Sequence, residues 1–322
     1  MLQQINRTLE KLIPYITPTA VIVGIIFSAY LKDFSYLVPW LFAFMTFEGS
    51  LTMNIRSIKG VMAHPVPVFI IIGFLHIIMP IWAWAVGHIT FNGDPLTITG
   101  IILAMVIPTG VTSFIWVSMK RGNTALTLAV ILIDSLLSPI IVPLSLSLLV
   151  GQKVEMDVSS MMSGLLYMIV IPSIAGILLN ELTKGKVVPV WKPRLSPISK
   201  IFLFCVVSLN GAVIAPYFDD FQVKYIYIIA VVFLVSFTGY LFSFFLGKLL
   251  KYDRDMLVTI TFSGGMRNIS AGAVIAISYF PSAVVFPVVV GMLFQQIIAS
   301  IFATILDKHH EKALVNSKAK GA

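Results

Sequence analysis

Long apolar stretches separated by short polar connections run through almost the whole chain of 322 residues. A helix that crosses the hydrocarbon core of a bilayer needs about 20 mostly apolar residues. Only 11% of the residues are charged, whereas about a quarter are charged in a soluble domain. The sequence therefore predicts an all-α polytopic membrane protein that lies in the lipid bilayer and has ten transmembrane helices. These helices are expected at residues 13–31, 35–53, 66–90, 98–119, 123–150, 158–181, 197–217, 224–250, 255–280 and 283–306.

The basic residues predict how these helices are oriented. If successive connections alternate between the two sides of the membrane, eighteen of the 22 Lys and Arg residues fall on one side. Three, Lys32, Lys153 and Lys224, fall on the other side, and Arg267 lies within the ninth stretch. Cytoplasmic connections carry the excess of positive charge. We therefore expect a multi-pass protein of the inner (plasma) membrane with both termini, and the polar tail 309–322, in the cytoplasm. The net charge of +8 then reflects topology and not nucleic-acid binding.

Two of the apolar stretches are interrupted at corresponding places. The fourth contains "IPTGVTSF" (107–114) and the ninth, five stretches later, contains "SGGMRNIS" (263–270). This spacing predicts two inverted five-helix repeats, about 10–155 and 156–308, whose breaks face each other near the bilayer centre. Backbone groups freed at a break need protein, water or ligand as partners, and opposed helix N-termini favour an anion. The alternative is that Pro108 and the glycines only kink the helices for packing.

Three segments around these breaks resemble the bile acid:sodium symporter family. They are Phe44–Val68, Pro108–Leu126 and "GGMRNISAG" at Gly264–Gly272. The resemblance implies one transporter domain over residues 1–322, with a panel of spans 1, 2, 6 and 7 and a core of spans 3–5 and 8–10. Spans four and nine would cross at their breaks. It also implies uptake of organic anions, from small carboxylates to bile-acid-like molecules, by alternating access and usually with two sodium ions.

The first sodium site that the resemblance implies is only partly kept. Ser113 matches a ligand position of the family, and Thr127 keeps a hydroxyl where the family has serine. Phe114 and Ile131 stand where the family has asparagine and threonine. Since sodium prefers oxygen ligands, two polar ligands of this site have become apolar.

The second implied sodium site departs further from the family. His76 occupies the position of a Gln or His, and Gly264 and Met266 match with their backbone. Ser263 replaces the acidic ligand shared by both sites, and Arg267 replaces a glutamine. A carboxylate has become a hydroxyl and a cation now stands beside it. We therefore expect no metal, or only a weakly bound sodium ion.

Arg267 is the residue that we expect to take the electrostatic role of sodium. An unpaired cation at this depth costs about 3 kcal/mol or more and is usually partnered. A guanidinium offers five donors, which would bridge freed carbonyls and face a carboxylate substrate. Asp134 is the candidate charge partner, because it lies seven residues beyond Thr127 and so on the same helix face. Alternatively, Asp134 caps a neighbouring helix or lines a wet crevice.

Four residues at the breaks are predicted to bind the substrate: Thr112, Ser113, Arg267 and Asn268. Small hydroxyl residues also arise from close helix packing, so packing is the alternative for the first two. His76 would serve proton coupling, given its reference pKa of about 6.5, or would be a satisfied core residue. Glu48, near the cytoplasmic end of the second stretch, has a weaker claim, and we expect water to reach it.

Other classes of function find less support in the sequence. The chain has no motif of an intramembrane enzyme, and its one cysteine, Cys205, excludes a disulfide framework. The sequence thus predicts a secondary transporter of small organic anions with no enzymatic activity and no cofactor, whose sodium coupling is weakened or replaced by Arg267. The alternatives are a conventional sodium-coupled symporter and a receptor that binds an organic anion without transporting it.

Overall fold

The computed structural model describes residues 16–53, 65–151, 154, 156–219 and 222–320, apart from the side chains of Asp219 and residues 312–320. This part of the chain is helical and contains no strand; an isolated bridge pairs Thr109 with Arg267. The first half contains α2 (Ser28–Leu31), η1 (Lys32–Leu37), α3 (Val38–Ser50), α5 (Val66–Gly73), η2 (Phe74–Ile78), α6 (Met79–Thr90), α7 (Pro95–Val106), α8 (Thr112–Met119) and α9 (Thr124–Val150). The second half contains α10 (Val158–Leu165), η4 (Leu166–Val170), α11 (Ile171–Leu182), α12 (Val187–Ile214), α13 (Pro216–Asp219), α14 (Val223–Leu249), α15 (Arg254–Gly265), α16 (Ile269–Tyr279) and α17 (Ser282–Lys320).

The described helices include six that are long and apolar enough to cross a membrane, or seven if one bent pair counts as a single span. This differs from the ten stretches counted in the sequence for two reasons. The first two stretches form a pair, Ile16–Ile26 and Ser28–Ser50, bent by 86°. The fourth and ninth stretches are each divided into two short helices. The six unbroken spans are Val66–Thr90, Thr124–Val150, Val158–Leu182, Val187–Ile214, Val223–Leu249 and Ser282–Glu311.

Five helices begin at an Asp or Asn whose side chain accepts a hydrogen bond from the backbone three residues later. This cap satisfies one of the backbone N–H groups that a helix start leaves unpaired. Asn268 is the cap that matters most for function, because it starts a helix in the middle of an apolar stretch. The caps are Asp94, Asn123, Asp157, Asp253 and Asn268.

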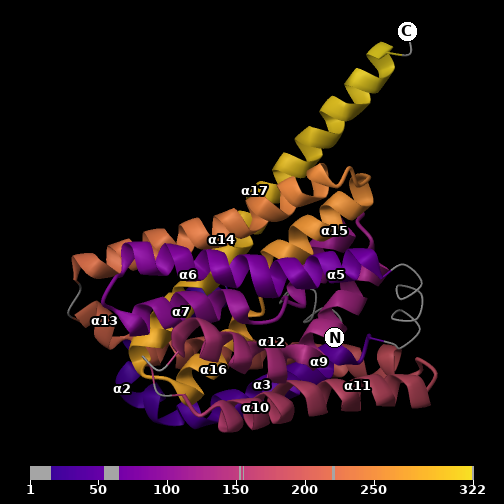
Figure 1. Ribbon diagram of the computed structural model, residues 1–322. Helices are drawn as coiled ribbons and strands as arrows, with labels where there is room; N and C mark the ends of the chain where they lie inside the picture. The colour runs from indigo at the N-terminus through magenta and orange to yellow at the C-terminus, as the bar shows by residue number, and fades with distance from the viewer. Residues whose placement is uncertain (1–15, 54–64, 152–153, 155, 220–221, 321–322) are drawn as a thin grey trace.

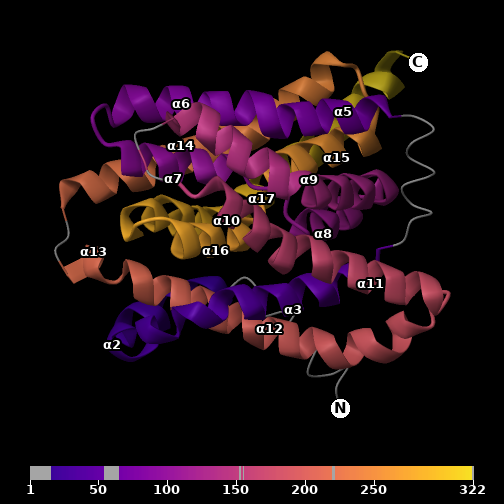
Figure 2. The ribbon, with the colours of Figure 1, turned by 60° about the horizontal axis from the view of Figure 1, so that its bottom comes forward.

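The helices gather into two groups (Figures 1 and 2). In one group, α3 packs against α11 and α12. In the other, α14 packs against α15 and α17, and α7 packs against α6 and α17. The C-terminal part of α17 projects beyond the other helices (Figure 1). Most residues of α7, α15 and α16 are thereby buried, whereas α8 exposes Ile115 and Met119.

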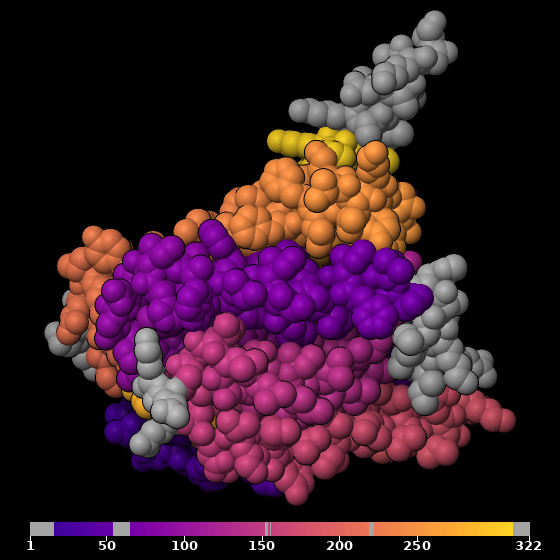
Figure 3. All heavy atoms as spheres, in the orientation of Figure 1, coloured from indigo at the N-terminus to yellow at the C-terminus, as the bar shows by residue number. Residues whose placement is uncertain are grey.

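The outer surface carries many large apolar side chains, as lipid contact requires. Examples are Leu148, 83% exposed, and Tyr167, 70% exposed. On the face drawn in Figure 3, the span Val66–Thr90 forms an unbroken band against helices from the middle of the chain. We therefore conclude that the protein is a multi-pass membrane protein, as the apolar stretches predicted.

Candidate functional site

The first break separates α7 from α8. Pro108 has no backbone N–H and disfavours helical geometry at the residue before it. Ile107 accordingly has a ψ of 150°, and α7 ends at Val106. The chain resumes a helix at Thr112. The proline therefore divides a stretch that would otherwise be long enough to form one continuous helix.

The second break separates α15 from α16. Helix α15 ends at Gly265, and Met266 is extended, with φ −90° and ψ 140°. Asn268 starts α16 by accepting a hydrogen bond from Ala271 N–H at 3.2 Å. Both interruptions predicted from the sequence are thus present.

The two breaks are joined by backbone and side-chain hydrogen bonds. Asn268 N–H donates to Pro108 C=O at 2.7 Å, beside the bridge between Thr109 and Arg267. The Thr109 hydroxyl donates to the carbonyl oxygens of Ser263 (2.8 Å) and Met266 (3.2 Å). These bonds satisfy groups that lipid would leave unpaired. The crossing of the two broken helices is therefore a tight contact between their non-helical segments.

Gly110 is required for this close approach. A Cβ atom added there would lie 2.8 Å from the carbonyl oxygen of Arg267, a backbone atom that cannot rotate away. We expect Gly110→Ala to lower the free energy of unfolding by about 1–3 kcal/mol, the usual cost of overpacking. Gly73→Ala is the matched control, because nothing lies within 4 Å of a Cβ at that position. Thermal melting in detergent measures both, and equal midpoints for the two variants would contradict the prediction.

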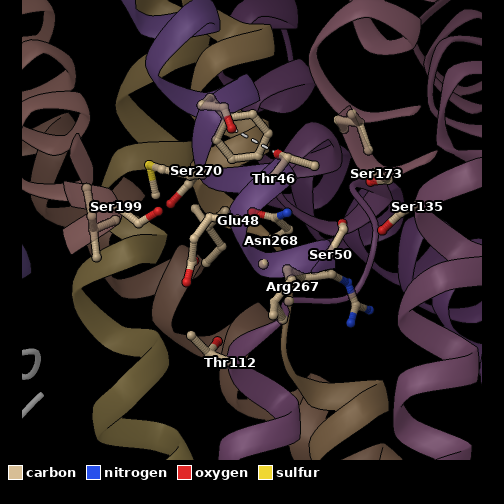
Figure 4. A pocket seen from close by; sticks show the side chains of 18 of the residues that line it. Thr46, Glu48, Ser50, Thr112, Ser135, Ser173, Ser199, Arg267, Asn268 and Ser270 are labelled. Atoms are coloured by element: carbon tan, nitrogen blue, oxygen red, sulfur yellow. Dashed lines mark hydrogen bonds between the residues drawn. The ribbon is translucent and has the colours of Figure 1, made fainter. Parts of the chain in front are cut away.

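Arg267 is buried inside the crossing, with 2% of its surface exposed. Its Nε donates to Met105 C=O at 3.1 Å, and its Nη1 donates to Gly264 C=O at 2.6 Å and to Met266 C=O at 3.3 Å. Nη2 is buried and has no hydrogen-bond partner. The guanidinium thus bridges carbonyls from both broken helices. In Figure 4 it points away from Glu48.

Asp134 does not form the expected direct pair with Arg267. Its Oδ1 lies 2.5 Å from Nε2 of His76, and its Oδ2 accepts a hydrogen bond from Thr109 N–H at 2.6 Å. Asp134 is fully buried, and only 6% of the His76 side chain is exposed. The prediction of an ion pair with Arg267 was therefore wrong, because the face of α9 that carries Asp134 meets η2 and the first break. Asp134 and His76 instead anchor the first break to the third span.

The positions that match the implied sodium sites fall into two environments. Phe114 and Ile131 lie in an apolar cluster with Met53, Leu132 and Ile177. The Thr127 hydroxyl donates to Asn123 C=O within its own helix, and Met266 lies in another apolar cluster. By contrast, the buried hydroxyls of Ser113 and Ser263 have no hydrogen-bond partner.

This donor set differs from the two sodium sites that the resemblance implies. Apolar side chains stand at two ligand positions, and the Arg267 guanidinium bonds to the carbonyls of Gly264 and Met266. Among the described residues, no group of three or more His, Cys, Asp or Glu side chains is placed to hold a metal ion.

A cavity of about 280 Å³ lies beside the crossing (Figure 4). One wall comes from α3, η4, α11 and α12, and the other from both breaks, α9 and α17. The first residues of α8 and α16, Thr112 and Ile269, border it. Thr112, Arg267 and Asn268 are among the predicted substrate-binding residues that line it, whereas Ser113 is buried elsewhere. Its further polar and charged lining residues are Thr17, Thr46, Glu48, Ser50, Ser135, Ser173, Ser196, Ser199, Lys200, Ser270, Gln295 and Gln296.

Most of these further lining residues were not identified from the sequence. Serines and threonines are frequent in membrane helices, so Ser135, Ser173 and Ser199 carried no signal of their own. Gln295 was also missed, although it accepts a hydrogen bond from Arg267 N–H at 3.0 Å. A pair of glutamines inside the last apolar stretch was the one signal available for it.

Comparisons with known proteins give one consistent result. The model of the family described as "Sodium Bile acid symporter family" matches residues 39–218. The "Uncharacterized protein YbaS" of Bacillus subtilis is 48% identical over 302 residues, which are 94% of this chain and 99% of that protein. The "Uncharacterized sodium-dependent transporter YocS" of the same organism is 25% identical over 92% of each chain. The "Probable sodium/metabolite cotransporter BASS1, chloroplastic" of Arabidopsis thaliana is 26% identical over 82% of this chain and 65% of that protein.

Proposed function

Because the chain belongs to the sodium bile acid symporter family, we propose that it is a secondary active transporter of small organic anions that works by alternating access. The cavity beside the paired breaks supports this proposal most strongly. It is bordered by the N-terminal residues of two helices, Thr112 and Ile269, and helix N-termini attract anions. Lys200 adds a basic side chain to the same cavity. No enzymatic activity and no cofactor are part of this proposal.

The size of the cavity favours a small substrate. Sites for drug-sized ligands have volumes of about 300–1,000 Å³, and this cavity has about 280 Å³. We therefore propose a small carboxylate as the substrate and not a molecule of bile-acid size.

Arg267 replaces the coupling ion in this proposal. Its three carbonyl partners, Met105, Gly264 and Met266, are backbone oxygens of the kind that would otherwise coordinate a cation. A guanidinium that is part of the chain holds the two breaks together at every stage of transport. Uptake would then need no sodium gradient.

The wider architecture that we propose follows the family. Ten spans would form inverted repeats at about 10–155 and 156–308, a panel (spans 1, 2, 6 and 7) and a core (spans 3–5 and 8–10) that move relative to each other. Both termini would be cytoplasmic. The packing of α3 against α11 and α12, and of α14 against α15 and α17, supports this division.

A second candidate function is conventional sodium-coupled symport. The unpaired, buried hydroxyls of Ser113 and Ser263 favour it, as do the names of two relatives, a sodium-dependent transporter and a probable sodium/metabolite cotransporter. Because the surrounding donor set is incomplete, any sodium bound there would be held weakly. We rank this candidate second for that reason.

A two-stage experiment tests the proposal. Purified protein is first screened for thermal stabilisation by pyruvate, lactate, glycerate and gluconate, each in sodium and in choline buffer. A ligand at 100 times its dissociation constant should stabilise the protein by about 2.7 kcal/mol. Uptake of the acid that stabilises the protein most is then measured in proteoliposomes with and without a sodium gradient. We expect equal uptake in both. Uptake that collapses without sodium would support the second candidate, and binding without uptake would indicate a receptor.

A further inference from the structure

Glu48 is a buried acid whose position none of the contacts described so far explains. It lies in the last turn of α3 and is 8% exposed. Its Oε1 has no hydrogen-bond partner. In Figure 4 its side chain extends into the cavity near Ser199, Asn268 and Thr112. An ionisable residue inside a membrane protein is expensive and usually serves a function.

The location of Glu48 within its helix adds to this cost. The C-terminal end of a helix carries a partial negative charge, so a carboxylate in the last turn of α3 is repelled by its own backbone. No basic residue lies in that turn. Packing would be served equally well by an apolar side chain of the same length. A purely structural role therefore does not account for the glutamate.

The cation of Lys192 compensates Glu48 only in part. Lys192 Nζ lies 3.8 Å from Glu48 Oε1, beyond hydrogen-bond distance, and 34% of the Lys192 side chain is exposed. Exposed ammonium groups give weak ion pairs. A carboxylate offers about four acceptor positions on its two oxygens. The Glu48 carboxylate thus keeps the capacity to accept hydrogen bonds from a molecule in the cavity.

The same wall of the cavity offers a second unpaired group. Ser199, on α12, is also 8% exposed, and its Oγ has no hydrogen-bond partner. Both residues line the same cavity as the helix N-termini at the breaks. One region of the cavity therefore suits a carboxylate, and another suits a group that donates hydrogen bonds.

We propose that Glu48 determines specificity by binding a hydrogen-bond donor on the transported carboxylate. The substrate class is then a small carboxylate that also carries a hydroxyl or an ammonium group, and simple fatty acids are rejected. This inference rests on the proposed transport function and defines its substrate class.

A series of three-carbon acids tests the inference, because its members differ little in volume. Propionate has no donor, lactate and 3-hydroxypropionate have a hydroxyl, and alanine and β-alanine have an ammonium group. Dissociation constants are measured by isothermal calorimetry on the full chain, and uptake is measured in proteoliposomes. We expect at least one donor-bearing acid to bind about 10- to 100-fold more tightly than propionate, as a hydrogen bond to a charged group predicts.

Two substitutions at Glu48 assign the preference to this residue. In Glu48→Leu, the dissociation constant of the acid that wild type binds most tightly should rise to within about threefold of the value for propionate. The dissociation constant of propionate itself should not change. Glu48→Gln keeps the shape and one acceptor oxygen, so it is measurable even where the leucine variant does not fold. It should weaken an ammonium-bearing acid more than a hydroxyl-bearing one. Glu311→Gln makes the same chemical change at an exposed position of α17 and should behave as wild type.

The outcomes separate this inference from the transport function. If propionate binds as tightly as every other acid, or if both Glu48 variants keep the wild-type preference, the inference is wrong and the transport proposal stands. If none of the five acids binds or is taken up, small-carboxylate transport fails as well.

Discussion

Replacing Asp134 by leucine should lower the free energy of unfolding by about 3 kcal/mol. The substitution leaves two buried donors, His76 Nε2 and Thr109 N–H, without the carboxylate that now accepts both. Both donors are shielded from bulk solvent, since Asp134 and Thr109 are fully buried and only 6% of the His76 side chain is exposed. The first break would lose its link to the third span. Thermal or denaturant unfolding in detergent measures the effect.

A double-mutant cycle separates the contribution of the His76–Asp134 contact to stability from the effect of removing a buried carboxylate. Combining His76→Leu with Asp134→Leu removes both partners. The free energy of unfolding of the double variant should therefore exceed, by about 1 kcal/mol or more, the value expected from adding the two single effects. Asp33→Asn is the control, because Asp33 is exposed in η1. Additive effects of the two substitutions would show that the contact does not contribute to stability.

Exchanging Arg267 for glutamine should reduce uptake by at least about tenfold. The guanidinium bonds to carbonyls of α7 and of the second break, and a glutamine has neither the charge nor enough donors to replace it. Adding Ser263→Glu to this variant restores a carboxylate beside the freed carbonyls. The double variant should recover part of the uptake, and only in the presence of sodium.

Two controls make this result interpretable. Arg267→Lys keeps the charge but loses the planar donor arrangement, so it should retain less than wild-type uptake and stay independent of sodium. Choline in place of sodium distinguishes ion binding from ionic strength. A folded double variant whose uptake is the same in sodium and choline would refute the substitution of Arg267 for the coupling ion.

The sequence predicted the two breaks because their causes are local. Pro108 cannot continue α7, and Gly264–Gly265 followed by Asn268 marks the end of one helix and the start of another. The burial of Arg267 was also predictable, because the residue lies in the middle of an apolar stretch. These features depend on backbone chemistry within a few residues and need no knowledge of the neighbours.

The features that the sequence failed to predict depend on contacts between helices. Asp134 was assigned to Arg267 from its helical face, yet that face meets His76 and Thr109. The helical period shows which residues share a face, but not which helix lies opposite. Glu48 had a weaker claim because it lies near the cytoplasmic end of its stretch, yet its side chain is buried. Its contact with Lys192 of α12, which is distant in the chain, could not be predicted from the sequence. Hydropathy also did not detect the bend of 86° between Ile16–Ile26 and Ser28–Ser50.

The hydrogen bonds between the two breaks also constrain how the protein is made. The Thr109 hydroxyl and its acceptor at Ser263 are 154 residues apart in the chain. Synthesis proceeds from the N-terminus, so α7 and α8 enter the membrane long before α15 exists. Until then the exposed backbone of the first break has no partner in lipid. The N-terminal half therefore reaches its final structure only after the second half has been inserted, and a chain truncated before residue 263 lacks the partner that its first half needs.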